Sequence, residues 1–159
     1  DDLIDAAVPA MKQMVDVAMR ENASTIRVME VSPADSVNYG IVEADAAPSY
    51  DRLSRLPRMV EKPKPGTTTS TRAVVGRYVL TSRIFHHLRT MPAGAGGEIQ
   101  LTDGIARLLT EERVVAYAFD GRRFDCGNKL GYLEATVELG LKHPEVGEGF
   151  RRYIAAHCG

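Results

Sequence analysis

Residues Met59–Pro65 read M-V-E-K-P-K-P, and the neighbouring segments are organised around this stretch. An apolar run that ends in Glu61, Lys62 and Pro63 predicts a strand that stops at its charged end, because proline cannot donate to a strand ladder. Glu61 could accept hydrogen bonds from sugar hydroxyls, and Lys62 could place a point charge against a phosphate. The tripeptide alone favours the alternative, which is a surface ion pair at a strand end.

The segments around this stretch alternate between strand patterns and helix patterns. Residues 3–8 are expected to lead into the first helix, and residues 46–56 to form a hairpin excursion. Together the elements predict a mixed α/β sheet with helices packed on it, in a single domain (1–159) with a helical C-terminal region (128–159). Strands are predicted at residues 26–31, 39–42, 58–62, 73–80, 114–119 and 121–125. Helices are predicted at residues 9–22, 83–89, 98–112, 128–142 and 149–157, with Ser82 and Asn128 as caps of two of them.

The composition excludes several classes of partner. The net charge is −1, so no basic surface indicates a nucleic acid or an anionic membrane. No apolar run reaches the length of about 18 residues that a membrane-spanning helix needs. The two cysteines, Cys126 and Cys158, do not make a disulfide framework, which fits a reducing, cytoplasmic location. His86 and His87 lie in a polar helical context and are predicted to be solvated.

Four short features stand at strand ends or at glycine-rich turns. They are Asp1-Asp2, Tyr39-Gly40, Glu61-Lys62 and Asp125-Cys126-Gly127. Function in mixed sheets gathers at the carboxyl ends of strands, and two carboxylates with phosphate oxygens suit Mg²⁺. These features also have purely structural explanations. Acidic residues such as Asp1 and Asp2 stabilise the start of a helix, and Asp125 could cap the next helix. The pattern is typical of phosphoryl or nucleotidyl transfer, in which positioning and charge neutralisation dominate.

Five motifs in a fixed order carry a family resemblance. They are Y-G at 39–40, V-E-K-P-K at 60–64, V-G-R-Y-V-L at 75–80, P-A-G-A-G-G-E-I-Q-L-T-D at 92–103 and D-C-G-N-K-L-G-Y at 125–132. Together they resemble the bacterial UTP–glucose-1-phosphate uridylyltransferases (UDP-glucose pyrophosphorylases) over nearly the whole chain. The resemblance implies a Rossmann-like mixed sheet of the nucleotide-diphospho-sugar transferase type. The 159 residues would hold the second part of that domain.

The resemblance also implies roles for individual residues. Asp1, with Asp2 as the less favoured alternative, and Asp125 would bind Mg²⁺. Lys62 would contact the sugar phosphate or diphosphate and, with Asp125, would be a catalytic residue. Glu61 would hold glucose hydroxyls. The substrate-binding residues would be Tyr39, Gly40, Glu61, Lys62, Val75 and Gly76.

The implied reaction is UTP plus glucose 1-phosphate giving UDP-glucose and pyrophosphate, by in-line attack without a covalent intermediate. The family's G-x-G-T-R loop, which grips the nucleotide, is not among these 159 residues, so we expect no turnover by them alone. The C-terminal region resembles an oligomerisation element, and a homo-oligomer is expected. Two alternatives remain: a sister enzyme for dTTP or another hexose phosphate, and a non-catalytic module derived from the fold.

Overall fold

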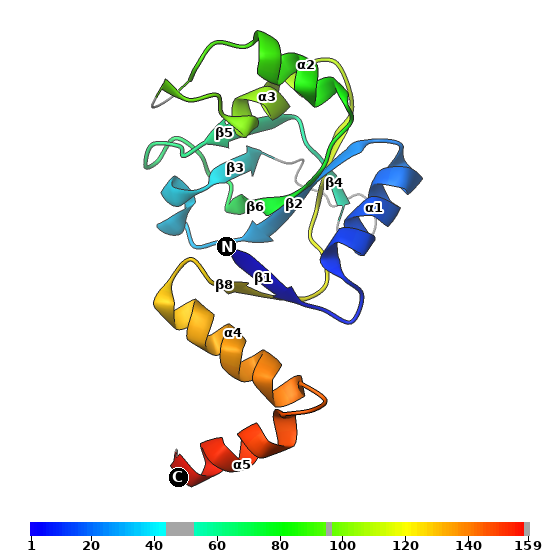
Figure 1. Cartoon of the computed structure of the whole chain (residues 1–159). Coiled ribbons are helices and arrows are strands. Elements are labelled where there is room, and N and C mark those ends of the chain that lie inside the picture. Colours follow the sequence, from blue (N-terminus) through cyan, green and yellow to red (C-terminus); the bar gives the residue numbers. More distant parts are fainter. Residues whose placement is uncertain (44–52, 95–96, 158–159) are drawn as a thin grey trace. The chain divides into compact units, whose positions relative to one another are not determined.

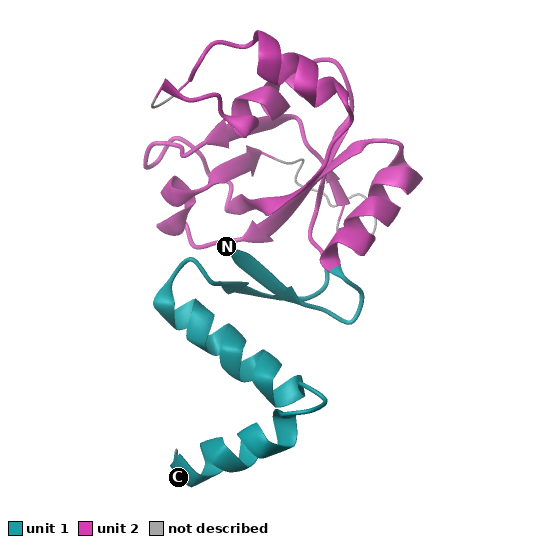
Figure 2. Cartoon of the chain, in the orientation of Figure 1, with its two compact units in different colours: residues 1–9, 120–159 teal, residues 10–119 magenta. Residues whose placement is uncertain are grey.

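The chain is described from a computed structural model, which covers residues 1–43, 53–94 and 97–157. It divides into two compact units, which Figure 2 colours separately. Residues 10–119 make the sheet unit, and residues 1–9 with 120–159 make the ribbon unit. The single domain expected from the sequence stays a prediction.

The described residues of the sheet unit form a six-stranded sheet in the order β4-β7-β2-β6-β3-β5 (Figure 1). β2 and β7 run parallel, whereas the other neighbouring pairs are antiparallel. The predicted mixed α/β sheet is therefore confirmed. Most of the predicted hairpin excursion at 46–56 lies outside the described residues. The strands are β2 (Ser24–Glu30), β3 (Gly40–Glu43), β4 (Leu53–Arg55), β5 (Arg58–Glu61), β6 (Arg72–Val79) and β7 (Val114–Tyr117).

Three α-helices and one 3₁₀ helix complete the described part of the sheet unit. One predicted helix is shorter than expected, since Gln100 has an extended backbone (φ −88°, ψ 129°) and α3 begins only after it. The predicted cap at Ser82 is wrong, because its side chain makes no capping hydrogen bond. The helices are α1 (Ala10–Glu21), η1 (Asp35–Asn38), α2 (Arg83–Thr90) and α3 (Leu101–Leu108).

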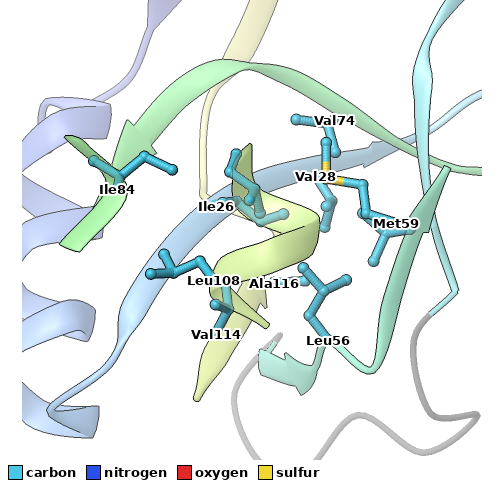
Figure 3. Packing of buried hydrophobic residues seen from close by; sticks show 11 residues of the cluster. Ile26, Val28, Leu56, Met59, Val74, Ile84, Leu108, Val114 and Ala116 are labelled. Carbon is cyan, nitrogen blue, oxygen red and sulfur yellow. The ribbon is translucent and has the colours of Figure 1, made fainter. Parts of the chain in front are cut away.

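The described residues of the sheet unit form two apolar clusters, and the side chains of β7 alternate between them. Val114 and Ala116 join the larger cluster, whereas Val115 and Tyr117 pack with the smaller one, which includes Val17 of α1. Successive side chains of a strand point to opposite faces, so both faces of β7 carry apolar side chains. Helices α2 and α3 contribute to the larger cluster (Figure 3). Its buried members are Ile26, Val28, Val42, Leu56, Met59, Val74, Ile84, Ile105, Leu108, Val114 and Ala116.

In the ribbon unit, residues 1–9 and 120–157 form a two-stranded antiparallel ribbon and two helices. β1 (Asp2–Asp5) pairs with β8 (Arg122–Asp125), so that Asp2 lies opposite Asp125 and Leu3 opposite Phe124. Residues 3–8 do precede the helix α1, as predicted, but the sequence did not predict that residues 2–5 pair with β8 as a strand. The helices are α4 (Lys129–Lys142) and α5 (Gly147–His157).

The predicted cap of α4 is confirmed, since Asn128 Oδ1 accepts a hydrogen bond from Gly131 N at 2.7 Å. Throughout the described part of the chain, no helix combines the length and the apolar composition needed to cross a bilayer.

Candidate functional site

Glu61 lies at the last position of β5, directly opposite Gly40 at the first position of β3. Its Oε2 atom accepts a hydrogen bond of 2.8 Å from the Thr102 hydroxyl. A Cβ atom built on Gly40 would lie 3.0 Å from the same oxygen. Any larger residue at position 40 would therefore press on the carboxylate, which is a physical reason for glycine opposite Glu61.

Lys62 continues the chain in a left-handed conformation with φ at 40°. This conformation costs a non-glycine residue about 1–2 kcal/mol, and such strain concentrates at functional sites. The Lys62 N–H donates to the carbonyl of Tyr39 at 3.1 Å, which extends the β3–β5 pairing by one residue. The Lys62 side chain is exposed, whereas Pro63 behind it is buried.

Val75 and Gly76 lie in an irregular part of β6. The register between β2 and β6 shifts from the pair Ile26–Tyr78 to the pair Val28–Val74, so β6 bulges between those pairs. Gly76 has φ at 31°, which glycine adopts without steric cost, and it is exposed. Val75 is buried.

Tyr78 follows the bulge on β6 and is half-buried. Burial raises the pKa of the Tyr78 phenol, and the negative charge of Glu61 raises it further. Tyr78 therefore stays a neutral hydroxyl near the Glu61 carboxylate at physiological pH. Sequence reasoning missed both Tyr78 and Thr102, although both stand in motifs that carry the resemblance.

Asp1 and Asp125 come together at the turn that follows β8. A Cβ atom on Gly127 would lie 3.1 Å from Asp1 Oδ2 and 3.1 Å from Asp125 Oδ1. The same Asp125 oxygen accepts a hydrogen bond from Gly127 N at 3.0 Å, and Cys126 N donates to the Asp1 carbonyl at 3.0 Å. The turn thus brings two carboxylates close to one glycine.

Asp2 has a different environment from Asp1. Its Oδ1 atom accepts from Arg123 Nε at 2.7 Å and lies 2.6 Å from Arg123 Nη2. The Asp2 side chain is 10% exposed and the Arg123 side chain 18%, so this ion pair is largely shielded from water. Arg123 Nη2 also lies 3.5 Å from Asp125 Oδ2, and the Asp125 side chain is 39% exposed. Because Asp2 is already engaged in an ion pair with Arg123, Asp1 is the better candidate to bind a cation together with Asp125.

The donor set at this turn fits a hard cation that takes only two protein ligands. Within residues 1–43, 53–94 and 97–157, no three His, Cys, Asp or Glu side chains form a group that could hold a metal ion. Mg²⁺ is usually bound through one or two carboxylates, and water and phosphate oxygens fill its other positions. Asp1 and Asp125 match this requirement, because both are carboxylates and neither is deeply buried.

Helix α4 begins tightly against the same turn. A Cβ atom on Gly131 would lie only 2.1 Å from the carbonyl oxygen of Asp125 and 2.9 Å from its carbonyl carbon. Only glycine allows this close approach of helix and turn. The backbone of Asp125 is thus held by α4, and its carboxylate by the bond from Gly127.

The paired histidines lie outside these two groups of residues. His86 is exposed, as predicted, but the prediction for His87 is wrong, since it is 5% exposed. It stands three residues after Ile84 on the buried face of α2, with Nε2 at 3.6 Å from Glu111 Oε2. Glu111 also accepts a hydrogen bond from Arg83, which lowers the pKa of that carboxyl, with a smaller contribution from His87.

The sequence-predicted site residues therefore fall into two sets. The sheet unit brings Tyr39, Gly40, Glu61 and Lys62 together at the β3–β5 end, with Val75 and Gly76 on β6. The ribbon unit brings Asp1 and Asp125 together around Gly127. The roles assigned to these residues from the resemblance stay predictions.

Comparison with known proteins identifies related enzymes. The sequence profile of the family described as nucleotidyl transferase matches residues 1–140. A UTP–glucose-1-phosphate uridylyltransferase of Staphylococcus epidermidis is 44% identical over 156 residues, which cover 97% of this chain and 53% of that enzyme. A relative of the same description from Staphylococcus haemolyticus is 42% identical over 154 residues, again covering 97% and 53%. The chain thus spans about half the length of the curated relatives it matches.

Solved structures agree with these sequence relatives. A UTP-bound UDP-glucose pyrophosphorylase of Acinetobacter baumannii superposes with a TM-score of 0.83 at 36% identity. That match covers 97% of this chain and 53% of the Acinetobacter chain. A UDP-glucose pyrophosphorylase complexed with UDP-glucose gives a TM-score of 0.80 at 33% identity, covering 89% and 54%. The expected nucleotidyltransferase-type sheet is confirmed by these matches.

Proposed function

Because the chain belongs to the nucleotidyl transferase family, we propose that its complete gene product makes UDP-glucose and pyrophosphate from UTP and glucose 1-phosphate. The observation that carries the proposal is the 44% identity, over 97% of this chain, to a UTP–glucose-1-phosphate uridylyltransferase. Because the chain spans 53% of that relative, the substrates and the activity are proposed for the complete gene product.

The β3–β5 end supplies groups suited to a sugar phosphate. The Glu61 carboxylate accepts hydrogen bonds from glucose hydroxyls, and the Lys62 ammonium lies against the phosphate. Tyr39 and Gly40 line the glucose pocket through their backbone, and Gly40 admits the close approach because it has no side chain. Val75 and Gly76 line it from β6, where the bulge exposes the Gly76 backbone.

Asp1 and Asp125 are proposed to hold Mg²⁺, supported by their shared position around Gly127. When bound, the cation would neutralise phosphate charge and polarise the reacting phosphoryl group. The Asn128 cap and the close packing of Gly131 keep Asp125 in place for this task.

The chemical step is an exchange of one phosphorus–oxygen bond for another. A phosphate oxygen of glucose 1-phosphate attacks the α-phosphorus of UTP, a new P–O bond forms, and the bond to the β-phosphate oxygen breaks to release pyrophosphate. Lys62 offsets the negative charge that develops in the transition state. No side chain needs to form a covalent bond with the nucleotide.

The proposal is tested by assaying the complete gene product with UTP, glucose 1-phosphate and Mg²⁺. UDP-glucose and pyrophosphate are expected in equal amounts, with dTTP and other hexose 1-phosphates used at least tenfold less efficiently. A preference for dTTP or another hexose would replace the proposal by a sister enzyme. If no combination of nucleoside triphosphate and hexose 1-phosphate gave a nucleotide sugar, a non-catalytic module would be favoured. The 159 residues alone are expected to release no UDP-glucose, since the G-x-G-T-R loop is not among them.

Asp1→Asn and Asp2→Asn should have different effects, although the residues are neighbours. Asp1→Asn is expected to raise the Mg²⁺ concentration for half-maximal activity about tenfold or more, because a ligand charge is lost, with unfolding unchanged. Asp2→Asn leaves the shielded Arg123 without its closest carboxylate and should lower the free energy of unfolding by about 1–3 kcal/mol. Mg²⁺ titrations and urea unfolding of both variants check this. The reverse pattern would make Asp2 the ligand.

The homo-oligomer, the Mg²⁺ requirement and the cytoplasmic location stay predictions. The C-terminal helices support the first of them, because they carry large apolar side chains that are exposed. These are Leu130, Tyr132, Leu133, Val137 and Tyr153, each at least 40% exposed.

A further inference from the structure

We propose that Thr102 is a positioning residue for Glu61, and that its hydroxyl fixes the carboxylate in the orientation that binds glucose 1-phosphate. The inference rests on the proposed function and deepens it, because it assigns a residue that acts on the sugar only through Glu61. Thr102 is the second residue of α3, and Glu61 is the last residue of β5. Forty-one positions separate them in the sequence.

The hydrogen bond between the two side chains is well formed. Thr102 Oγ1 donates to Glu61 Oε2 at 2.8 Å, and the pair is partly buried. A hydrogen bond to an ionised acceptor is stronger than one between neutral groups, and partial burial strengthens it further. The hydroxyl is thus directed at the carboxylate across the α3–β5 contact.

Gly40 also lies close to the same carboxylate oxygen. The Cβ position of Gly40 lies 3.0 Å from Glu61 Oε2 and 3.4 Å from the Thr102 methyl carbon. Oε2 therefore contacts both a hydrogen-bond donor and a backbone position where a side chain would crowd it. Among the described residues, the structure gives Glu61 Oε1 no hydrogen-bond donor, which leaves that oxygen as the acceptor for a sugar hydroxyl.

A carboxylate held in this way binds its ligand more tightly than a freely rotating one. Ordering a flexible side chain when a ligand arrives costs free energy, and a side chain that is ordered beforehand avoids the cost. The Glu61 carboxylate is partly buried where it meets Thr102, and a lower local dielectric makes its orientation matter more. Thr102 should therefore influence affinity for glucose 1-phosphate and leave affinity for UTP alone.

The test compares variants of the complete gene product by steady-state kinetics. Thr102→Val keeps the shape and removes the donor, and Thr102→Ser keeps the donor. Thr102→Val is expected to raise KM for glucose 1-phosphate about tenfold with KM for UTP unchanged, and Thr102→Ser should restore most of the loss. The matched control is Thr110→Val, which removes an exposed hydroxyl bonded to the Arg107 carbonyl and should change neither KM.

A double-mutant cycle with Glu61→Ala separates a positioning role from a structural one. Glu61→Ala alone should raise KM for glucose 1-phosphate strongly, and adding Thr102→Val should then change it less than twofold. If Thr102→Val still costs tenfold without Glu61, or raises both KM values equally, the inference is overturned while the proposed function stands. If the unmodified protein makes no UDP-glucose, or Glu61→Ala leaves KM unchanged, the proposed role of Glu61 fails and the inference fails with it.

Discussion

Gly131→Ala is expected to lower the free energy of unfolding by about 3 kcal/mol or more, and to abolish the activity of the complete gene product. The added Cβ would lie 2.1 Å from the Asp125 carbonyl oxygen, far inside van der Waals contact with rigid backbone. Overpacking of this kind typically costs 1–3 kcal/mol, and more where backbone has to move. Because the shifted atoms belong to Asp125, the carboxylate proposed to hold Mg²⁺ should be displaced as well.

Gly149→Ala is the matched control for that variant. Gly149 lies within α5, and a Cβ atom there has nothing within 4 Å. Alanine should therefore stabilise the helix by up to about 1 kcal/mol, with activity unchanged. Chemical unfolding followed by circular dichroism measures both variants. Equal unfolding midpoints for Gly131→Ala and the unmodified protein would contradict the tight packing of α4 on the turn.

Lys62→Met is expected to lower kcat for UDP-glucose formation by about 10²–10³-fold, with the unfolding midpoint unchanged. Methionine keeps the length of the side chain but removes the charge proposed to face the phosphate, and losing one such interaction in a transition state has an effect of this size. The backbone strain at position 62 is the same for both residues, because neither is glycine. Stability should therefore not change.

Lys64→Met provides the comparison for Lys62→Met. Lys64 is also an exposed lysine of the M-V-E-K-P-K-P stretch, but it stands two residues beyond the end of the β3–β5 pairing. Its replacement should change kcat less than twofold. Equal losses for the two variants would indicate a general electrostatic effect of the stretch and would remove Lys62 from the catalytic residues.

The sequence predicted those parts of the structure whose signals are local. A strand ending at Lys62 was predicted from an apolar run and Pro63, one residue beyond the observed end of β5 at Glu61, and the cap of α4 was predicted from Asn128. Both depend on residues within three or four positions of each other. Gly40 also belongs to one of the five motifs. The physical reason for a glycine there is its contact with the Glu61 carboxylate, which only the pairing of β3 with β5 reveals.

Features that depend on distant partners could not be predicted in this way. Residues 2–5 became a strand only because β8, about 120 positions later, pairs with them. The Thr102–Glu61 bond crosses 41 positions, and no local pattern in a helix start indicates a partner on another strand. His87 is buried because it lies on the same inward-facing side of α2 as Ile84. Its polar neighbours in the sequence gave no indication of this burial. In each case tertiary contacts override local preference.

The ribbon unit is discontinuous in the sequence, since it combines residues 1–9 with residues 120–159, whereas the sheet unit is the continuous segment between them. During synthesis at about 5–20 residues per second, β1 therefore remains unpaired for on the order of ten seconds until β8 has been synthesised. The sheet unit has all its own strands before that moment. Asp2 and Asp5 place negative charges on the unpaired β1, and such charges disfavour pairing with other nascent chains. Asp1 and Asp125 thus meet only after the whole sheet unit has been synthesised.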